Sequence, residues 1–172
     1  VRYLTSTNIG AWAQDKISRF ALLPQNDDGP IMWDFGSAAK HHQENCPWLG
    51  NDQFGEPRSR PGISLLRGAI SPEMGIAEDV ARKIKTELEK RGLHNEPVAI
   101  DIVEPPVWFA LQKEGLTLVD GQQILSAARV IKTEDEISLL NHAAMMVDAA
   151  YHELYQAIKP GMMESQAVGL AS

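Results

Sequence analysis

The sequence predicts an α/β fold in which a mixed sheet is flanked by helices and followed by a separate helical segment. Two observations lead to this prediction. Expected strands and helices alternate between residues 63 and 128, which favours a partly parallel sheet. A long amphipathic helix then begins at Thr133, after a junction near residue 130. We therefore expect an α/β domain over residues 1–130 and the first helices of an incomplete second domain over residues 131–172.

The first part of the chain is expected to hold a small meander, a helix and a loop. Three short strands are predicted, at residues 2–5, 18–23 and 31–35. The turn sequence Asn-Asp-Asp-Gly-Pro precedes the third strand. Ser37 is expected to cap a helix that ends at Asn45. Residues 46–62 carry glycine and proline without an apolar period, so a long loop is expected there.

A helix is expected to begin at Ser71-Pro72-Glu73 and to end at Gly92, because these residues suit an N-cap, a first helical position and an acidic first turn. One face of this helix carries an apolar residue at every fourth position: Ile76, Val80, Ile84 and Leu88. The elements expected around it are strands at 63–66, 98–103 and 116–119 and helices at 106–113 and 120–127, the last capped by Asp120.

The helix from Thr133 has a defined start and stop. Thr133 and Glu136 have the spacing of a capping box, in which each side chain bonds the backbone N–H of the other residue. Pro160-Gly161 ends the pattern. The helix also carries an apolar stripe that is expected to be buried: Ile137, Leu140, Ala144, Val147, Tyr151, Leu154 and Ile158.

Two motifs resemble a known family. The stretch from Arg129 to Ile137 and the sequence I-K-P-G-M at 158–162 are similar to the entry of the catalytic domain in the pita-bread metallohydrolases, which include creatinase, prolidase and aminopeptidase P. Val1 to Thr5 resembles a strand of that family's N-terminal domain. Ser6-Thr7-Asn8 with Trp12, and the strands that follow, are closer to the dimethylsulfoniopropionate lyase branch than to prolidases.

The resemblance implies that the parent enzyme is a metal-dependent Xaa-Pro peptidase or a creatinase-like hydrolase. The alternatives are a dimethylsulfoniopropionate lyase of the same family and a non-catalytic pita-bread scaffold. The family's five ligands to a divalent metal pair (Mn, Zn, Fe or Co) are two aspartates, one histidine and two glutamates, and they would follow residue 172. We therefore expect no catalytic residue, metal ligand or cofactor in this chain, and no activity from it alone.

The resemblance also implies a homodimer. In creatinase-like dimers the segment between the first two strands reaches the active site of the partner subunit, and here that segment runs from Ser6 to Arg19. Trp12, Asp15, Lys16 and Arg19 are its candidate substrate-binding residues. The expected substrate is a small peptide or a small zwitterion.

Composition excludes several classes of partner. With 23 acidic and 16 basic residues the net charge is −7, which does not suit nucleic-acid binding. No apolar run approaches the roughly 20 residues needed to span a bilayer. The single cysteine, Cys46, cannot form an internal disulfide, so a reducing cytoplasm is expected.

The remaining candidates are histidines and tryptophans. His41-His42 with Cys46 is interpreted as a polar helix end, because adjacent histidines rarely ligate one ion. Trp33 and Trp108 are expected to pack in the core. For Trp12 and Trp48, which lie in expected loops, a site or interface role and packing under their own loops both remain open.

Overall fold

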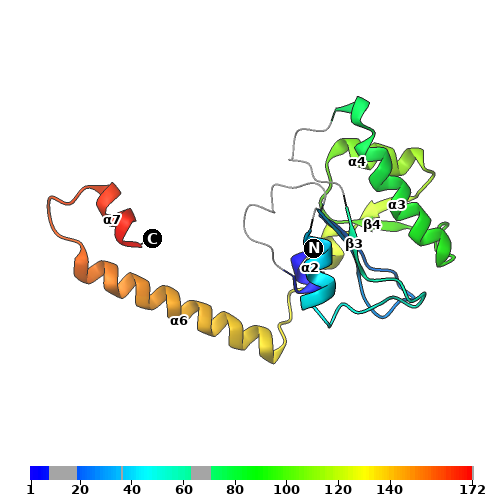
Figure 1. Cartoon of the computed structure of the whole chain (residues 1–172). Coiled ribbons are helices and arrows are strands. Elements are labelled where there is room, and N and C mark those ends of the chain that lie inside the picture. Colours follow the sequence, from blue (N-terminus) through cyan, green and yellow to red (C-terminus); the bar gives the residue numbers. More distant parts are fainter. Residues whose placement is uncertain (8–18, 36, 63–70, 172) are drawn as a thin grey trace. The chain divides into compact units, whose positions relative to one another are not determined.

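The computed structural model describes residues 1–7, 19–35, 37–62 and 71–171 (Figure 1). Contacts divide the chain into two compact units, Val1–Gln122 and Gln123–Ser172. This division falls a few residues before the junction expected near residue 130. The assignment of these parts to two domains of a larger protein stays a prediction.

The first unit alternates short strands with helices. Its elements are α1 (Arg2–Thr5), β1 (Phe20–Leu22), β2 (Ile31–Asp34), α2 (Ala38–Asn45), β3 (Ser59–Pro61), a 3₁₀ turn (Pro72–Met74), α3 (Ile76–Lys90), β4 (Val98–Ile100), α4 (Pro105–Lys113), β5 (Leu118–Asp120) and the start of α5 (Gln122–Ala128). The second unit holds α6 (Glu134–Ala157) and α7 (Glu164–Ala171). The strand expected at 63–66 lies outside the described residues.

A mixed three-stranded sheet forms the centre of the first unit, as the sequence predicts. Strand β2 lies between β1, which is antiparallel to it, and β3, which is parallel to it. The prediction of a loop over 46–62 was wrong for its last residues, because Ser59–Pro61 forms strand β3. Its sequence Ser-Arg-Pro has no apolar alternation, and its pairing depends on the distant β2, with Met32 opposite Ser59.

The strand predicted at residues 2–5 was also wrong. Arg2–Thr5 forms the single helical turn α1. The backbone N–H groups of Leu4 and Thr5 and the hydroxyl of Thr5 all donate to the carbonyl oxygen of Val1. These local hydrogen bonds hold the turn without any help from a neighbouring strand.

The two faces of the sheet are covered differently. On one face, Met32 packs with Cys46 and Leu49 below α2. On the other face, Trp33 stacks on Phe20 of β1 with ring centroids 4.7 Å apart, and Phe20 packs against the apolar cluster of α3. Because both faces are covered, all four residues of β2 are buried. Trp33 is therefore a core residue, as predicted.

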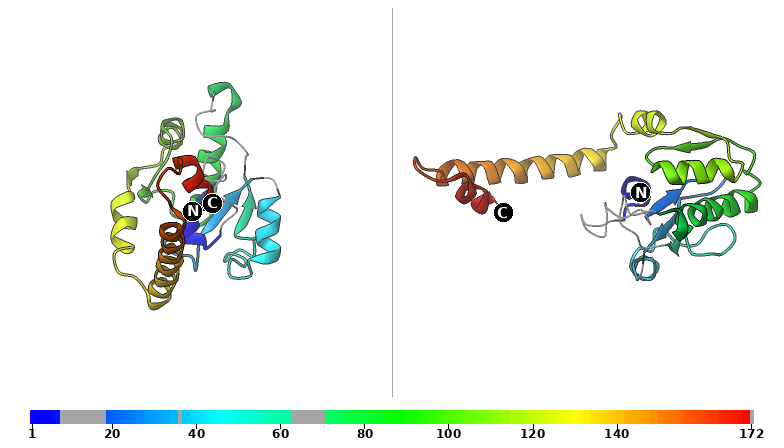
Figure 2. Two further views of the ribbon diagram at one scale, coloured as in Figure 1. Left: turned by 90° about the vertical axis from the view of Figure 1, so that its left-hand side faces the viewer. Right: turned by 90° about the horizontal axis from the view of Figure 1, so that it is seen from above.

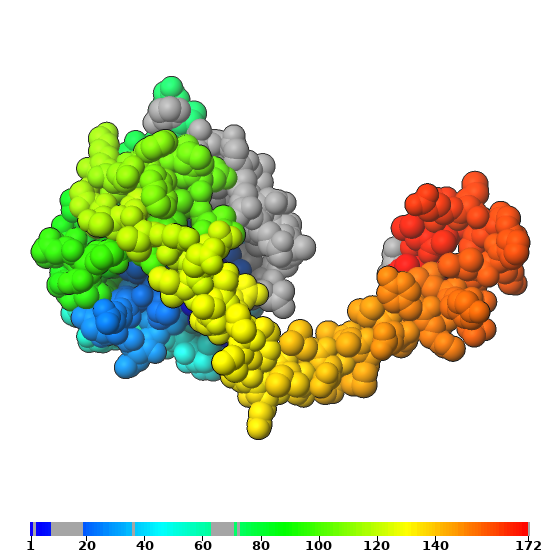
Figure 3. Space-filling model, turned by 180° about the vertical axis from the view of Figure 1, so that it is seen from behind, coloured from blue at the N-terminus to red at the C-terminus, as the bar shows by residue number. Residues whose placement is uncertain are grey.

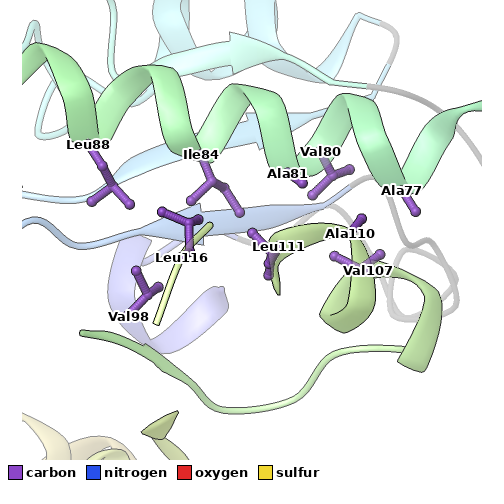
Figure 4. Close-up of a cluster of buried hydrophobic side chains, with 10 residues drawn as sticks. All are labelled: Ala77, Val80, Ala81, Ile84, Leu88, Val98, Val107, Ala110, Leu111 and Leu116. Carbon is purple, nitrogen blue, oxygen red and sulfur yellow. The ribbon is translucent and has the colours of Figure 1, made fainter. Parts of the chain in front are cut away.

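Helix α3 supplies half of the residues of one apolar cluster. The predicted face of Ile76, Val80, Ile84 and Leu88 is confirmed, since all four side chains are buried. Figure 4 shows the α3 side chains pointing toward those of α4 and of the strand region beyond it. The residues of this cluster are Ala77, Val80, Ala81, Ile84, Leu88, Val98, Val107, Ala110, Leu111 and Leu116.

The start of α3 differs from the prediction. The expected cap sequence at Ser71 opens only a 3₁₀ turn, and the helix proper begins at Ile76. Gly75 lies between them with φ +62°, a left-handed conformation that glycine adopts without the penalty other residues pay. This residue separates the turn from the helix.

A second, two-stranded parallel sheet follows α3. Val98 of β4 lies opposite Leu118 of β5. Gly121 follows β5 and passes so close to β4 that a Cβ there would lie 2.9 Å from backbone atoms of Ile100. Asp120 then accepts the N–H of Gln122 at 2.8 Å, which confirms it as the residue that caps α5.

The second unit contains the long helix predicted from Thr133. Both bonds of the capping box are present: Glu136 N–H to the Thr133 hydroxyl at 3.2 Å, and Thr133 N–H to the Glu136 carboxylate at 2.9 Å. Figure 2 shows α6 as one uninterrupted helix. No helix in the described part of the chain is long and apolar enough to cross a membrane.

The apolar stripe of α6 is not buried in this chain. Leu140 is 55 % exposed, and Ile137 and Val147 are similarly open. Within the second unit α7 packs against α6 (Figure 3) but leaves this face uncovered. The prediction that the stripe is buried therefore applies only to a protein in which another surface covers this face of α6.

An ion-pair network ties the loops of the first unit to the end of α3. Arg91, just after α3, has a fully buried side chain. Its guanidinium donates to Asp27 at 2.9 Å, to Asp52 at 2.9 Å and to Glu87 at 2.6 Å. One cation thus joins the turn before β2, the loop before β3 and the last turn of α3.

Two further arginines extend this network. Arg58 donates to the carboxylate of Asp27 and, at 2.6 Å, to the carbonyl of Gly29. Arg60 donates to Asp52 at 2.6 Å and to Glu87. Three buried carboxylates are therefore matched by three arginines from separate parts of the chain.

The network determines the ionisation of its acids. Burial alone would raise the pKa of Asp27, but hydrogen bonds from Arg58 and Arg91 outweigh it and lower the pKa. The pKa of Asp52 is also lowered. Burial alone would raise it, but hydrogen bonds from two backbone N–H groups of its own turn and from Arg91 outweigh burial. Their contribution to stability is present above about pH 4 and is lost as the pH falls further.

The network can be tested by replacing its central cation. We predict that Arg91→Met lowers the free energy of unfolding by about 3–5 kcal/mol, because three carboxylates lose a buried partner. Arg82→Met on the exposed side of the same helix is the matched control and should change it by less than about 0.5 kcal/mol. Urea denaturation followed by circular dichroism measures both. Equal, small effects would show that the network contributes little.

Candidate functional site

The predicted substrate-binding residues lie in or beside the segment between α1 and β1. Trp12, Asp15 and Lys16 lie outside the described residues. Arg19 is described, as are Ser6 and Thr7 at the other end of the segment. The structure therefore describes the residues on either side of 8–18.

Arg19 connects both ends of the segment to the sheet. Its Nε donates to Oδ2 of Asp34 on β2 at 2.9 Å. Its Nη2 donates to the carbonyl oxygen of Thr7 at 3.2 Å and to the Thr7 hydroxyl. The Arg19 side chain is only 9 % exposed. In this chain it joins Thr7 to Asp34, and its predicted contact with substrate stays a prediction.

The threonines complete this attachment. The hydroxyls of Thr5 and Thr7 lie 2.7 Å apart, and both residues are buried. Ser6 between them has φ +51°, a left-handed conformation that costs a non-glycine residue about 1 kcal/mol or more. We call Thr5, Thr7, Arg19 and Asp34 the neck. Its hydrogen bonds keep Ser6 in this strained conformation.

Asp34 is the buried acceptor on β2 to which Arg19 of the neck donates. Its side chain is fully buried, and Oδ1 accepts the backbone N–H of Phe35 at 2.9 Å. Oδ2, which accepts from Arg19, also lies 3.5 Å from Nδ1 of His42. Among the described residues, this nitrogen has no hydrogen-bond partner.

The interpretation of His41-His42 as a polar helix end was wrong for His42. His42 is 2 % exposed, because α2 packs on the sheet with Ala39 and His42 facing inward. His41 faces outward and is exposed. Burial lowers the pKa of His42, and nearby Arg19 lowers it further, while Asp34 raises it without reversing the shift. The imidazole is therefore neutral at neutral pH.

Cys46 lies one turn after His42 and is buried. Burial raises the pKa of its thiol, so the thiolate that binds metals is disfavoured. Within the described residues, three potential ligands converge only at Asp52, Glu56 and Glu87. These carboxylates are engaged by the arginines and Lys90 of the network. They do not fit the metal pair that the family resemblance implies.

Trp48 supports the neck from outside. It is 61 % exposed, and its indole N–H donates to the carbonyl oxygen of Thr5 at 3.1 Å. With Ser6, Asp28 and Arg58 it lines an open pocket of about 380 Å³. Its role was open from the sequence, and in the structure it contacts the backbone just before Ser6. Trp108 is partly buried on α4.

Comparison with known proteins identifies two sequence relatives. The chain is 27 % identical over 156 residues to the dimethylsulfoniopropionate lyase DddP of Roseobacter denitrificans, covering 90 % of the chain and 33 % of that protein. It is 26 % identical over 167 residues to the lyase of the same name from Roseovarius nubinhibens, covering 94 % and 35 %. The chain thus spans about a third of the length of these curated relatives. No protein-family model matches it.

A solved structure shares the fold. The chain superposes on an Xaa-Pro dipeptidase from Bacillus anthracis with a TM-score of 0.60 and 17 % identity, covering 99 % of the chain and 39 % of the dipeptidase. The fold class predicted from the sequence is therefore confirmed. The sequence relatives together with this fold confirm the resemblance to the pita-bread metallohydrolases.

The buried imidazole predicts a pH dependence of stability. The unfolded chain binds a proton at His42 near pH 6.5, whereas the folded chain binds it only at lower pH. The contribution of the neutral imidazole to stability is therefore fully present above about pH 6.5 and is lost as the pH falls below it. We predict that His42→Gln reduces the fall in melting temperature between about pH 7.5 and pH 5.5. His41→Gln is the matched control and should keep the wild-type fall. Identical pH dependence in all three proteins would contradict the assignment.

Proposed function

We propose that this chain is the N-terminal, non-catalytic part of a metal-dependent enzyme that acts on a small zwitterion, with dimethylsulfoniopropionate as the favoured substrate. The observation that supports this most is the extent of the similarity. It runs along nine-tenths of this chain but only a third of each lyase. The remaining two-thirds of such a protein would carry the metal ligands and the reacting centre.

The substrate chemistry explains what a non-catalytic part can contribute. Dimethylsulfoniopropionate has a carboxylate at one end and a sulfonium at the other. A lyase removes a proton beside the carboxylate, and the electrons of the C–S bond leave with dimethyl sulfide, so that acrylate remains. The part proposed here binds the charged ends and excludes water, which strengthens the electrostatic interactions of the site.

Each predicted site residue has a role in this proposal. Trp12 packs its ring against the sulfonium, and Asp15 pairs with the same positive end. Lys16 pairs with the carboxylate. Arg19 joins Thr7, before residues 8–18, to Asp34 on the sheet. The chain forms a homodimer in the cytoplasm, and its segment walls the pocket of the partner subunit.

Two alternatives remain in the same family. A metal-dependent Xaa-Pro peptidase is favoured by the shared fold with the dipeptidase. A non-catalytic scaffold is the other, and it would lack some of the five metal ligands in the rest of the protein. Both keep the dimer-forming role of this chain and differ from the lyase in what the complete protein does.

Chimeric proteins separate these functions. Residues 1–172 would replace the matched segment in the Roseobacter denitrificans lyase and, separately, in the Bacillus anthracis dipeptidase. We predict that the lyase chimera releases dimethyl sulfide from dimethylsulfoniopropionate, whereas the dipeptidase chimera leaves Xaa-Pro dipeptides uncleaved. The isolated chain with added manganese, zinc, iron or cobalt should act on neither substrate.

The controls for this experiment are the two parent enzymes with the segment deleted. Circular dichroism and sedimentation must show that each chimera is folded and dimeric. Activity of the dipeptidase chimera alone would favour the peptidase. Two folded but inactive chimeras would reject the proposal that this chain can complete either enzyme.

A further inference from the structure

We propose that the open pocket beside Trp48 binds a small organic cation, such as a methylated ammonium. The pocket has a volume of about 380 Å³ and lies between the end of α1, the turn before β2 and the loop between α2 and β3. Ligand pockets in proteins are of roughly this size, about 300–1,000 Å³. The inference concerns binding by this chain alone and does not rest on the proposed function.

Trp48 gives the pocket an aromatic wall. Its indole N–H donates to the carbonyl oxygen of Thr5 at 3.1 Å, which restricts the orientation of the ring beside α1. This bond uses the single polar atom of the side chain, so the exposed remainder is aromatic carbon. The electron-rich face of an indole attracts organic cations more strongly than the ring of any other side chain. An exposed tryptophan held in this way suits a methylated cation.

Asp28 gives the pocket its negative charge. It lines the pocket and is exposed, and within the described part of the chain no hydrogen bond or ion pair engages its carboxylate. Arg58 also lines the pocket, but its buried guanidinium donates to Asp27 and to the carbonyl of Gly29. The charge of Arg58 is therefore matched by Asp27. The unmatched charge of Asp28 attracts a cation and repels an anion.

The lining favours an organic cation over a metal ion. Asp28 is the one carboxylate among the described residues of the pocket. A calcium ion takes roughly six to eight oxygen ligands, several of them from carboxylates, and an aromatic wall supplies none. A methylated cation needs one charge and an apolar contact, which Asp28 and Trp48 provide. Ser6, with φ +51°, lines the same pocket, and strained residues of this kind cluster at ligand sites.

The test compares the binding of choline with that of its neutral isostere, the alcohol in which a carbon atom replaces the nitrogen. Isothermal titration calorimetry on the whole chain, at constant ionic strength, measures both. We expect one choline to bind per chain with a dissociation constant on the order of millimolar. The neutral alcohol should bind at least about fivefold more weakly, because it has the same shape but no charge.

Two variants and a matched control locate the site. Asp28→Asn removes the charge from an exposed side chain, and Trp48→Ala removes the aromatic wall. Each should weaken choline binding at least about threefold. Asp101→Asn removes the same charge from an exposed residue that does not line the pocket, and it should bind choline as the wild-type chain does. Circular dichroism checks the fold, and if Trp48→Ala does not fold, Asp28→Asn carries the comparison with the control.

Three results would overturn the proposal. The first is that choline does not bind at about ten times the expected dissociation constant. The second is that choline and its neutral isostere bind equally well, which would mean that charge is not recognised. The third is that Asp28→Asn binds choline as tightly as Asp101→Asn does, which would place choline elsewhere on the chain. None of these results bears on the proposed function, which the chimeras test separately.

Discussion

A guanidinium that is cut off from water must be compensated inside the protein, and Arg91 obtains this from three carboxylates. These acids come from the turn before β2, the loop before β3 and the last turn of α3. Removing water from such a group costs several kcal/mol, which only close hydrogen-bonded partners offset. The charge of Arg91 therefore requires all three segments to meet at one place, although two of them contain little apolar sequence.

This requirement extends to the candidate site through the sheet. Arg58 and Arg60 hold the network on either side of the first residue of β3. Strand β3 pairs with β2, where Trp33 lies opposite Arg60. The next residue of β2 is Asp34, which holds the neck. The loops, the central strand and the attachment of the segment are thus parts of one connected arrangement.

Sequence patterns predicted the elements that are stabilised by residues close together in the sequence. The four-residue spacing in α3 and the Thr133–Glu136 capping box both appear as expected, because helices and caps are closed by residues near in sequence. Residues distant in sequence decide the rest. Strand β3 forms by pairing with β2, and His42 is buried because α2 packs on the sheet. Arg19 was singled out in the sequence as a candidate substrate contact, but its hydrogen-bond partner Asp34 was not predicted, since no local pattern joins the two residues.

We propose that this chain walls the active site of the other subunit of a homodimer, and mixed dimers of the lyase chimera test this claim directly. One subunit lacks a metal ligand, so only the other subunit can react. The claim predicts that Trp12→Ala lowers activity at least about tenfold when placed on the subunit without metal. The same change on the metal-containing subunit should have no effect. The claim is contradicted if activity instead depends on Trp12 of the metal-containing subunit.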